Sequence, residues 1–291
     1  MDLKQLTYLL AVRDAGSFTK AASSLHVAQP AISMAIAKLE QQLELRLFDR
    51  QDRAVRLTPE GEVLCRHADR LLLQMHQAEA EMAELKGLER GEVRIGIPYM
   101  MGSYYFPPRL MAFKHRYPGL KIRVEEAGTR ELLSRIVDGA LDLAILITSD
   151  LPPAIEGVPL LNEEMLMVVG EDHPLRNESS VTLSQFFSQE LALFRRGFYH
   201  REHMEALAQT LGIELNIAFE SNLIPLLKAV VRQGFAVTTF LRMVLEEEPD
   251  LSGVPFDPPI NLDLCVAWRR GDPLSMANRA LRDFLLMDRP T

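Results

Sequence analysis

The sequence has few of the residues and segments on which several classes of protein depend. Its two cysteines, Cys65 and Cys265, are too far apart for a disulfide framework or for a paired metal or redox motif. No apolar run is long enough to span a bilayer, and the first residues lack the apolar core of a signal peptide. We therefore expect a cytoplasmic protein without a membrane partner.

The usual signatures of an enzyme are missing as well. The sequence contains no glycine-rich phosphate loop and no nucleophile elbow. His200 and His203 are close enough to share a metal ion, but no obvious third ligand accompanies them. We therefore expect no catalytic residue, no bound metal and no cofactor.

Positive charge is also scarce, since 32 Lys and Arg oppose 40 Asp and Glu and give a formal net charge of −8. Residues 1–57 differ from the rest, because their eight Lys and Arg exceed their six Asp and Glu and leave them at +2. The remainder then carries −10. Only a docking face must be positive for DNA binding, so the overall acidity does not exclude it. It does weaken long-range attraction, which favours binding as a dimer or larger assembly.

Residues 17–43 predict two short helices joined by a turn. Ser17 is a suitable N-cap for the first helix, and Pro30 suits the first turn of the second. Such a helix pair can place the start of its second helix in the major groove of DNA, although an ordinary helical bundle has similar spacing. The inward face of the second helix is defined by apolar residues at helical spacing, which are Ile32, Ile36, Leu39 and Leu43.

The outward face of that second helix carries the predicted DNA contacts. Gln29 can bond an adenine with two hydrogen bonds, and Met34 can lie against a thymine methyl group. A hairpin at residues 45–57 follows, and its arginines can contact the phosphates, with Asp49 and Asp52 as alternative local partners. The predicted DNA-binding residues are Gln29, Pro30, Ser33, Met34, Lys38, Arg50 and Arg53.

Taken in order along the chain, these motifs resemble those of the LysR-type transcriptional regulators. The resemblance rests on DLKQLTYLLAVRDAGSFTKAA, AQPAISMAIAKLEQQL, LFDR, LTPEG, FPPRLMAFKHRYPG, VDGALDLAI and HPL, and it extends to about Gly234. It implies an α/β protein with an N-terminal all-α winged helix-turn-helix, a long linker helix and a bilobed effector domain like that of periplasmic binding proteins. The family commonly has a basic residue where this chain has Met34 and a hydroxyl where it has Ala28. We therefore expect DNA recognition that depends on apolar contact and groove shape.

A long helix begins at Thr58 and Pro59 and is predicted to run to about Gly87. Its narrow apolar stripe repeats every seven residues through Ala68, Met75 and Met82, and through Leu64, Leu71, Ala78 and Leu85. The preceding domain is too small to cover the whole stripe, so we expect a dimer through this helix. Packing of the stripe against its own domain is the alternative. The resemblance extends the dimer to a tetramer built as a dimer of dimers.

From Glu92 onward, strand and helix patterns alternate, which is typical of a mostly parallel sheet covered by helices. The length of 291 residues favours two or three domains. We expect a winged helix-turn-helix domain at residues 1–58, a linker and dimerisation helix at 59–90 and an effector domain at 91–291. By resemblance, lobe I covers about 91–161 plus 266–291, and lobe II covers about 162–265.

Ligands of open α/β sheets bind beyond the carboxyl ends of strands, and the resemblance implies effector contacts at these positions. We expect a small organic acid with an apolar or aromatic body, its carboxylate facing one of the arginines at positions 195, 196 and 201. The alternative is that these arginines pair locally with Glu190, Glu202 or Glu205. The predicted effector-binding residues are Met100, Met101, Gly102, Ser103, Thr129, Thr148, Phe194, Arg195, Arg196, Arg201 and Ser221.

The sequence as a whole therefore predicts a DNA-binding transcriptional regulator controlled by a small-molecule effector. Its expected partners are double-stranded promoter or operator DNA, the effector, further copies of itself and RNA polymerase. A thiol switch of the peroxide-sensing kind known in the family needs closely placed cysteines, which this chain does not have. The alternative function is a cytosolic small-molecule-binding protein or an enzyme with an α/β ligand domain.

Overall fold

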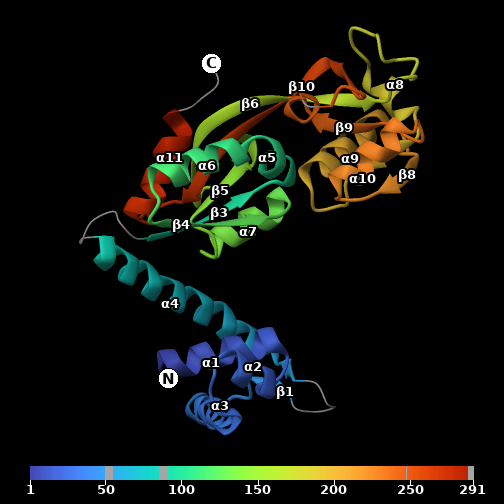
Figure 1. Ribbon diagram of the computed structural model, residues 1–291. Helices are drawn as coiled ribbons and strands as arrows, with labels where there is room; N and C mark the ends of the chain where they lie inside the picture. Colours follow the sequence, from blue (N-terminus) through green and yellow to red (C-terminus); the bar gives the residue numbers. More distant parts are fainter. Residues whose placement is uncertain (50–54, 85–90, 247, 288–291) are drawn as a thin grey trace. The chain divides into compact units, whose positions relative to one another are not determined.

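The computed structural model describes residues 1–49, 55–84, 91–246 and 248–287 (Figure 1). The chain divides into two compact units, one formed by Met1–Lys86 with Asp138–Ala140 and one by the rest of the chain. After their predicted roles we call them the DNA-binding unit and the effector unit. The predicted fold class is confirmed, because an N-terminal winged helix-turn-helix and a long helix precede an α/β unit. None of the described helices is both long enough and apolar enough to cross a membrane.

The DNA-binding unit is built from helices with well-defined ends. Asp2 and Gln5 form a capping box at the start of α1, and the Ser17 hydroxyl accepts a hydrogen bond from the backbone N–H of Lys20 in α2. Gly16 ends α1 in the left-handed conformation that favours glycine, with a φ of 58°. The elements are α1 (Leu3–Ala15), α2 (Phe18–Ser24), α3 (Gln29–Leu43), β1 (Phe48–Asp49), β2 (Arg56–Leu57) and α4 (Pro59–Glu84).

The first turns of α4 are part of the core of the DNA-binding unit. Cys65 and Ala68 are buried there together with Ile32 and Ile36 of α3. Gly61 allows this packing, because a Cβ atom at this position would lie 2.2 Å from the carbonyl oxygen of Leu47. The alternative for the apolar stripe, packing against its own domain, therefore holds at the beginning of the helix.

The effector unit is organised around a six-stranded sheet in the order β4-β3-β5-β10-β6-β9. β3, β4 and β5 are parallel, whereas β6, β9 and β10 pair in antiparallel fashion. β6 and β10 are long paired strands that run from one lobe into the other (Figure 1). The strands are β3 (Gly91–Ile97), β4 (Leu120–Glu126), β5 (Leu143–Ile147), β6 (Ile155–Val169), β9 (Thr238–Leu241) and β10 (Ser252–Arg269), with β7 (Leu191–Leu193) and β8 (Ile217–Glu220) forming a separate parallel pair.

Alternate residues of β5 face two apolar layers. Leu143 and Ile145 join the core that contains α6 and α11, whereas Ala144 and Leu146 join the core that contains α7. The fully buried strand follows from its apolar sequence and gives the loops at its ends a rigid base. The helices of the unit are α5 (Tyr99–Tyr104), α6 (Phe106–Arg116), α7 (Thr129–Val137), α8 (Leu183–Phe187), α9 (Tyr199–Leu211), α10 (Ile224–Arg232) and α11 (Met276–Met287), with 3-10 turns η1 (Thr148–Asp150) and η2 (Arg242–Leu245).

Two features differ from what the sequence favours. The sheet is not mostly parallel, because β10 pairs antiparallel with β5 and β6, and β6 pairs antiparallel with β9. The residues that follow β3, which the sequence favours as a loop, form the short helix α5 (Tyr99–Tyr104). Pro98 occupies the N-cap position without a side-chain hydrogen bond, and Gly102 lies inside the helix. These residues are weak helix signals, so the local sequence favours a loop and tertiary packing decides the outcome.

Candidate DNA interface and effector cavity

The tip of α3 is an exposed, mostly uncharged surface. The Gln29 side chain donates a hydrogen bond to the Ser33 hydroxyl at 2.7 Å, so these two predicted contacts are held together. Met34 is 67% exposed, which is unusual for an apolar side chain, and Pro30 and Lys38 are exposed beside it. An exposed methionine next to a polar pair can meet both a thymine methyl group and a base edge.

The wing is anchored to the helices on its β1 side. The Glu40 carboxylate accepts hydrogen bonds from the backbone N–H groups of Leu47 at 2.8 Å and Phe48 at 3.3 Å. The Phe48 ring packs edge-on against Phe18 of α2, with 5.6 Å between ring centroids. The first strand of the hairpin is therefore fixed relative to α2 and α3. The predicted DNA contacts Arg50 and Arg53 lie outside the described residues.

The middle of α4 presents apolar side chains that its own unit does not cover. Leu71 is 42% exposed and Met82 is 59% exposed, in contrast to the fully buried Ala68 one turn before Leu71. The predicted stripe thus has two parts, a buried start and an exposed continuation. An exposed apolar stripe on a long helix is a surface suited to a partner helix.

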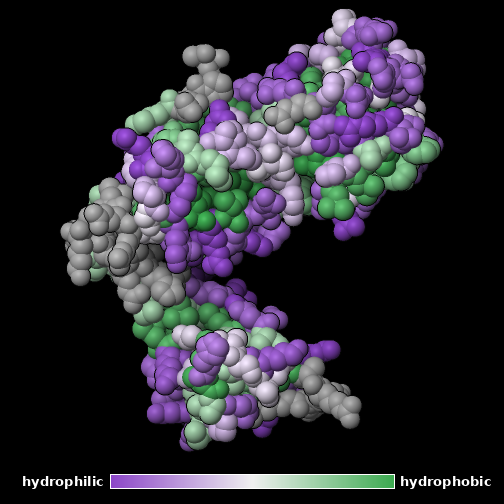
Figure 2. Space-filling view, in the orientation of Figure 1, coloured by the Kyte–Doolittle hydropathy of each residue, from purple (hydrophilic) through white to green (hydrophobic). Residues whose placement is uncertain are grey.

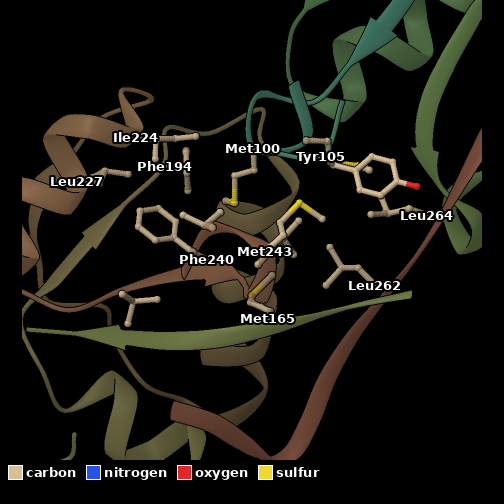
Figure 3. Packing of buried hydrophobic residues seen from close by; sticks show 14 of the residues in the cluster. Met100, Tyr105, Met165, Phe194, Ile224, Leu227, Phe240, Met243, Leu262 and Leu264 are labelled. Carbon is tan, nitrogen blue, oxygen red and sulfur yellow. The ribbon is translucent and has the colours of Figure 1, made fainter. Parts of the chain in front are cut away.

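The effector unit contains a small apolar cavity bounded by elements of both lobes. Its volume is about 40 Å³, which is room for about three water molecules. Figure 3 shows side chains from segments far apart in the sequence, among them Met100, Phe194, Leu262 and Leu264, gathered in this region. The lining consists of Pro98, Tyr99, Met100, Met101, Ala127, Gly128, Thr129, Ile147, Phe194, Phe198, Tyr199, His200, Leu241, Leu262 and Leu264.

Four ring side chains along the cavity form a continuous row of contacts. The Tyr99 ring of lobe I lies 5.5 Å from the Phe198 ring of lobe II, measured between centroids. Phe198 stacks on Phe194 at 6.1 Å, and Phe194 contacts the His200 ring at 5.6 Å. Because Tyr99 and Phe198 belong to different lobes, their ring contact joins the two lobes beside the cavity.

Backbone atoms of the two lobes also meet directly beside the cavity. A Cβ atom at Gly128, before α7, would lie 2.3 Å from the carbonyl oxygen of Gly197. Gly197 itself has a φ of 93°, which favours glycine. Two polar contacts join the lobes further out, Arg130 with Glu202 at 2.8 Å and Lys228 with the Tyr104 hydroxyl at 3.0 Å.

One polar atom in the lining has no partner in the described part of the chain. Nε2 of His200 is buried and makes no hydrogen bond there. Burial, with a smaller contribution from His203, lowers the pKa of His200 to about 3, so its imidazole is neutral at pH 7. A buried nitrogen without a partner is uncommon in proteins and is a group with which a bound molecule can form a hydrogen bond.

Among the residues that line the cavity, all of them described, none is charged. The N-terminus of α7 opens beside Gly128 and favours an anion, typically by about 0.3–1 kcal/mol. Burying an unpaired carboxylate costs several kcal/mol, which is larger. The balance of these two effects disfavours an anionic occupant.

Four of the predicted effector-binding residues line the cavity: Met100, Met101, Thr129 and Phe194. The remaining predicted residues are not part of this lining: Gly102, Ser103, Thr148, Arg195, Arg196, Arg201 and Ser221. Ser103, Thr148 and Arg195 are exposed, and the Ser221 hydroxyl accepts a hydrogen bond from the backbone N–H of Leu223.

Two of the three arginines that were expected to face an effector carboxylate are paired with local carboxylates in the structure. The Arg201 side chain is 5% exposed and forms ion pairs with Glu205 at 2.8 Å and Glu220 at 2.7 Å. Arg196 pairs with the same Glu205 at 3.0 Å. Although burial opposes it, these two guanidiniums hold the pKa of Glu205 below its ordinary value. The alternative of local pairing with Glu205 therefore holds.

Several lining residues escaped prediction from the sequence. Phe198, Tyr199 and His200 follow Gly197 directly, and this run of rings before a helix was the available signal. Leu262 and Leu264 gave no such signal, because their alternation in β10 is that of any half-buried strand.

Both cysteines are buried, and they lie in different units. Burial raises the pKa of Cys65 to about 11, and it also raises the pKa of the Cys265 thiol. Both thiols therefore remain protonated at neutral pH, which makes them poor nucleophiles. The described residues also contain no group of three or more His, Cys, Asp or Glu side chains that could hold a metal ion.

Comparisons with known proteins agree with both halves of this architecture. Residues 3–62 match the family of bacterial regulatory helix-turn-helix proteins of the lysR type, and residues 86–288 match the LysR substrate binding domain. The hydrogen peroxide-inducible genes activator of Haemophilus influenzae is 31% identical over 279 residues, which cover 94% of this chain and 92% of that protein. These relatives are transcriptional regulators and not enzymes.

Solved structures give the same result. A full-length OxyR variant from Pseudomonas aeruginosa superposes with a TM-score of 0.74 at 25% identity, over 98% of this chain and 94% of that one. CbnR, a LysR family transcriptional regulator, gives a TM-score of 0.74 at 20% identity over the full length of both chains, which is a likeness of fold. The chain therefore belongs to the LysR family of DNA-binding transcriptional regulators, which join a helix-turn-helix domain to an effector-binding domain.

Proposed function

We propose that this regulator changes its DNA binding when a small molecule with an apolar or aromatic body occupies the cavity between the two lobes. The observation that carries the proposal is the apolar cavity itself, whose lining comes from α5, α7, α9, β9 and β10. A molecule too large for this cavity has to displace lining side chains, and its entry would part Tyr99 from Phe198 and so move one lobe relative to the other. A ligand that favours the parted lobes shifts the population toward them.

We propose further that the tip of α3 makes the sequence-specific contacts, within a DNA-binding domain at residues 1–58. Gln29, Pro30, Ser33, Met34 and Lys38 supply them, and Met34 gives the apolar component. The arginines at positions 50 and 53 would add phosphate contacts from the hairpin. Residues 59–90 would then form the linker, and residues 91–291 the effector domain.

Self-association is the third part of the proposal. The exposed residues Leu71 and Met82 support a dimer through α4. In lobe II, Figure 2 shows apolar side chains gathered over α10, where Leu223 is 65% exposed and Leu226 is 45% exposed. This second apolar surface supports a tetramer.

Analytical ultracentrifugation of Leu71→Glu tests the first interface, with Arg66→Glu on another face of α4 as the matched control. A Leu71→Glu protein that keeps the wild-type mass contradicts the α4 dimer.

The effector site is tested by filling the cavity. Leu264→Phe narrows it, whereas Leu211→Phe makes the same change at an exposed position of α9. A thermal-shift screen of small aromatic compounds first identifies a binder, and footprinting on the protein's own promoter follows. We expect the compound to change the footprint of the wild-type and Leu211→Phe proteins and to have no effect on Leu264→Phe. An unchanged response in Leu264→Phe rejects the interlobe site.

A further inference from the structure

Nε2 of His200 is the feature of the cavity that the proposed function leaves unexplained. It is buried at the start of α9, and no described residue forms a hydrogen bond with it. The other polar side chains of the lining, Tyr99, Thr129 and Tyr199, are not among the buried groups without a partner. A buried nitrogen without a partner, among mostly apolar side chains, favours a ligand that carries a matching polar group.

The aromatic side chains next to Nε2 of His200 suit a ligand with an aromatic ring. His200, Phe194, Phe198 and Tyr99 contact one another in sequence, with ring centroids 5.5 to 6.1 Å apart. Aromatic rings pack well against other aromatic rings in offset or edge-on arrangements. When Tyr99 and Phe198 separate, they lose their contact with each other, and an aromatic ligand between them can replace it.

The charges around the cavity complete the description. Arg196 and Arg201 are paired with Glu205, and Lys228 is paired with Glu248. The Lys228 ammonium group also donates to the Tyr104 hydroxyl. Arg195 is exposed and is not part of the cavity lining. An anion entering the cavity would therefore have to reach Arg195, break one of these pairs or remain without a counter-ion, whereas a neutral molecule needs no counter-ion.

We propose that the effector is an uncharged aromatic molecule with a hydroxyl group that hydrogen-bonds to Nε2 of His200. A hydroxyl can donate or accept, so it satisfies the imidazole nitrogen in either tautomer. A phenol is the simplest molecule of this class. The inference rests on the proposed interlobe site and adds the chemistry of its ligand.

The test uses three probes with the same ring: phenol, toluene and benzoate. Ligand-observed NMR measures their affinities for the full-length protein near neutral pH, where benzoate is anionic. His200→Phe removes the nitrogen and keeps a ring, and His203→Phe is the matched control at a half-buried histidine outside the lining. Leu264→Phe reports whether each probe binds in the cavity.

We expect phenol to bind at least about tenfold more tightly than benzoate, and His200→Phe to reduce phenol binding about tenfold without weakening toluene binding. His203→Phe should leave the phenol affinity unchanged. Benzoate that binds more tightly than phenol, or a phenol-to-toluene ratio unchanged in His200→Phe, overturns the ligand chemistry while Leu264→Phe still blocks binding. Failure of all three probes to bind, or binding unaffected by Leu264→Phe, overturns the interlobe site as well.

Discussion

The tip of α3 and the interlobe cavity are opposite kinds of recognition surface. On α3, polar and charged side chains such as Gln29 and Lys38 project into solvent, with Met34 as the apolar exception. The cavity is lined mostly by apolar side chains, and Nε2 of His200 is its buried nitrogen without a partner in the described part of the chain. The first surface suits a polyanion, and the second suits an uncharged molecule. One chain can therefore bind both partners without competition between them.

The two regions also differ in how firmly they are packed. Gly61 and Gly128 each approach a backbone carbonyl oxygen, at 2.2 and 2.3 Å from where a Cβ would lie. Gly61 makes this contact within the core of the DNA-binding unit, against the backbone of Leu47. Gly128 makes it between the two lobes, which we propose move apart when a ligand binds. The same close approach of a glycine to a carbonyl oxygen thus supports the packing of α4 in one unit, whereas in the other it depends on how the two lobes are placed.

Gly61→Ala should have the largest effect. The added methyl group meets the backbone of Leu47, so α4 must shift, and we expect the free energy of unfolding of the DNA-binding unit to fall by about 3 kcal/mol. Gly128→Ala should be milder, because the lobes can separate. Urea denaturation of both variants measures the difference. Equal losses of stability in Gly61→Ala and Gly128→Ala would contradict the expectation that the contact between the lobes yields more easily than the contact in the DNA-binding unit.

Lys38→Glu should reduce DNA affinity about 10- to 100-fold at low salt, because a cation facing phosphates becomes an anion. Lys121→Glu makes the same change at an exposed position of β4 and should have little effect. Fluorescence anisotropy at several salt concentrations measures both affinities and the salt dependence. Wild-type affinity in Lys38→Glu would mean that this lysine lies away from the DNA.

Acid should destabilise the effector unit through His200. Its pKa is about 3 in the folded protein and 6.5 ordinarily, so between these values the unfolded chain binds a proton that the folded chain does not. Above about pH 6.5 protonation of His200 costs no stability. Lowering the pH from about 7 to 5 should reduce the free energy of unfolding of the effector unit by about 2 kcal/mol. The lowered pKa values of His173 and His203 act in the same direction. His200→Gln should be less sensitive to pH in thermal melts, and an equally steep dependence would assign the effect to other groups.

The smallest effect is expected from oxidants. Because burial raises the pKa values of Cys65 and Cys265, the thiolate fraction at neutral pH is very small. Millimolar hydrogen peroxide should leave DNA binding unchanged, in contrast to what the names of several relatives imply for those proteins. Mass spectrometry after alkylation of the folded protein should detect little modification. Rapid labelling of Cys265 would show that the effector unit exposes this thiol.

The sequence predicted those features whose causes are local. Ser17 as an N-cap and the buried face of α3 with Ile32 and Ile36 follow from helix period and capping alone, and both are confirmed. The cavity depends on contacts between distant segments, so Met100 and Phe194 were predicted from strand ends whereas Leu264 was not. The ion pairs of the arginines also depend on distant segments and could not be predicted from the local sequence. Arg201 lies near the start of a helix as expected, but its pairing with Glu220 depends on the folded position of β8.

The strands β6 and β10 connect the lobes as one hydrogen-bonded ribbon and not as two independent tethers. A two-stranded ribbon flexes readily across its flat side and resists bending within its own plane. We therefore expect the lobes to rotate as rigid bodies about one preferred hinge axis. Motion from an occupied cavity would then reach neighbouring subunits with a defined direction.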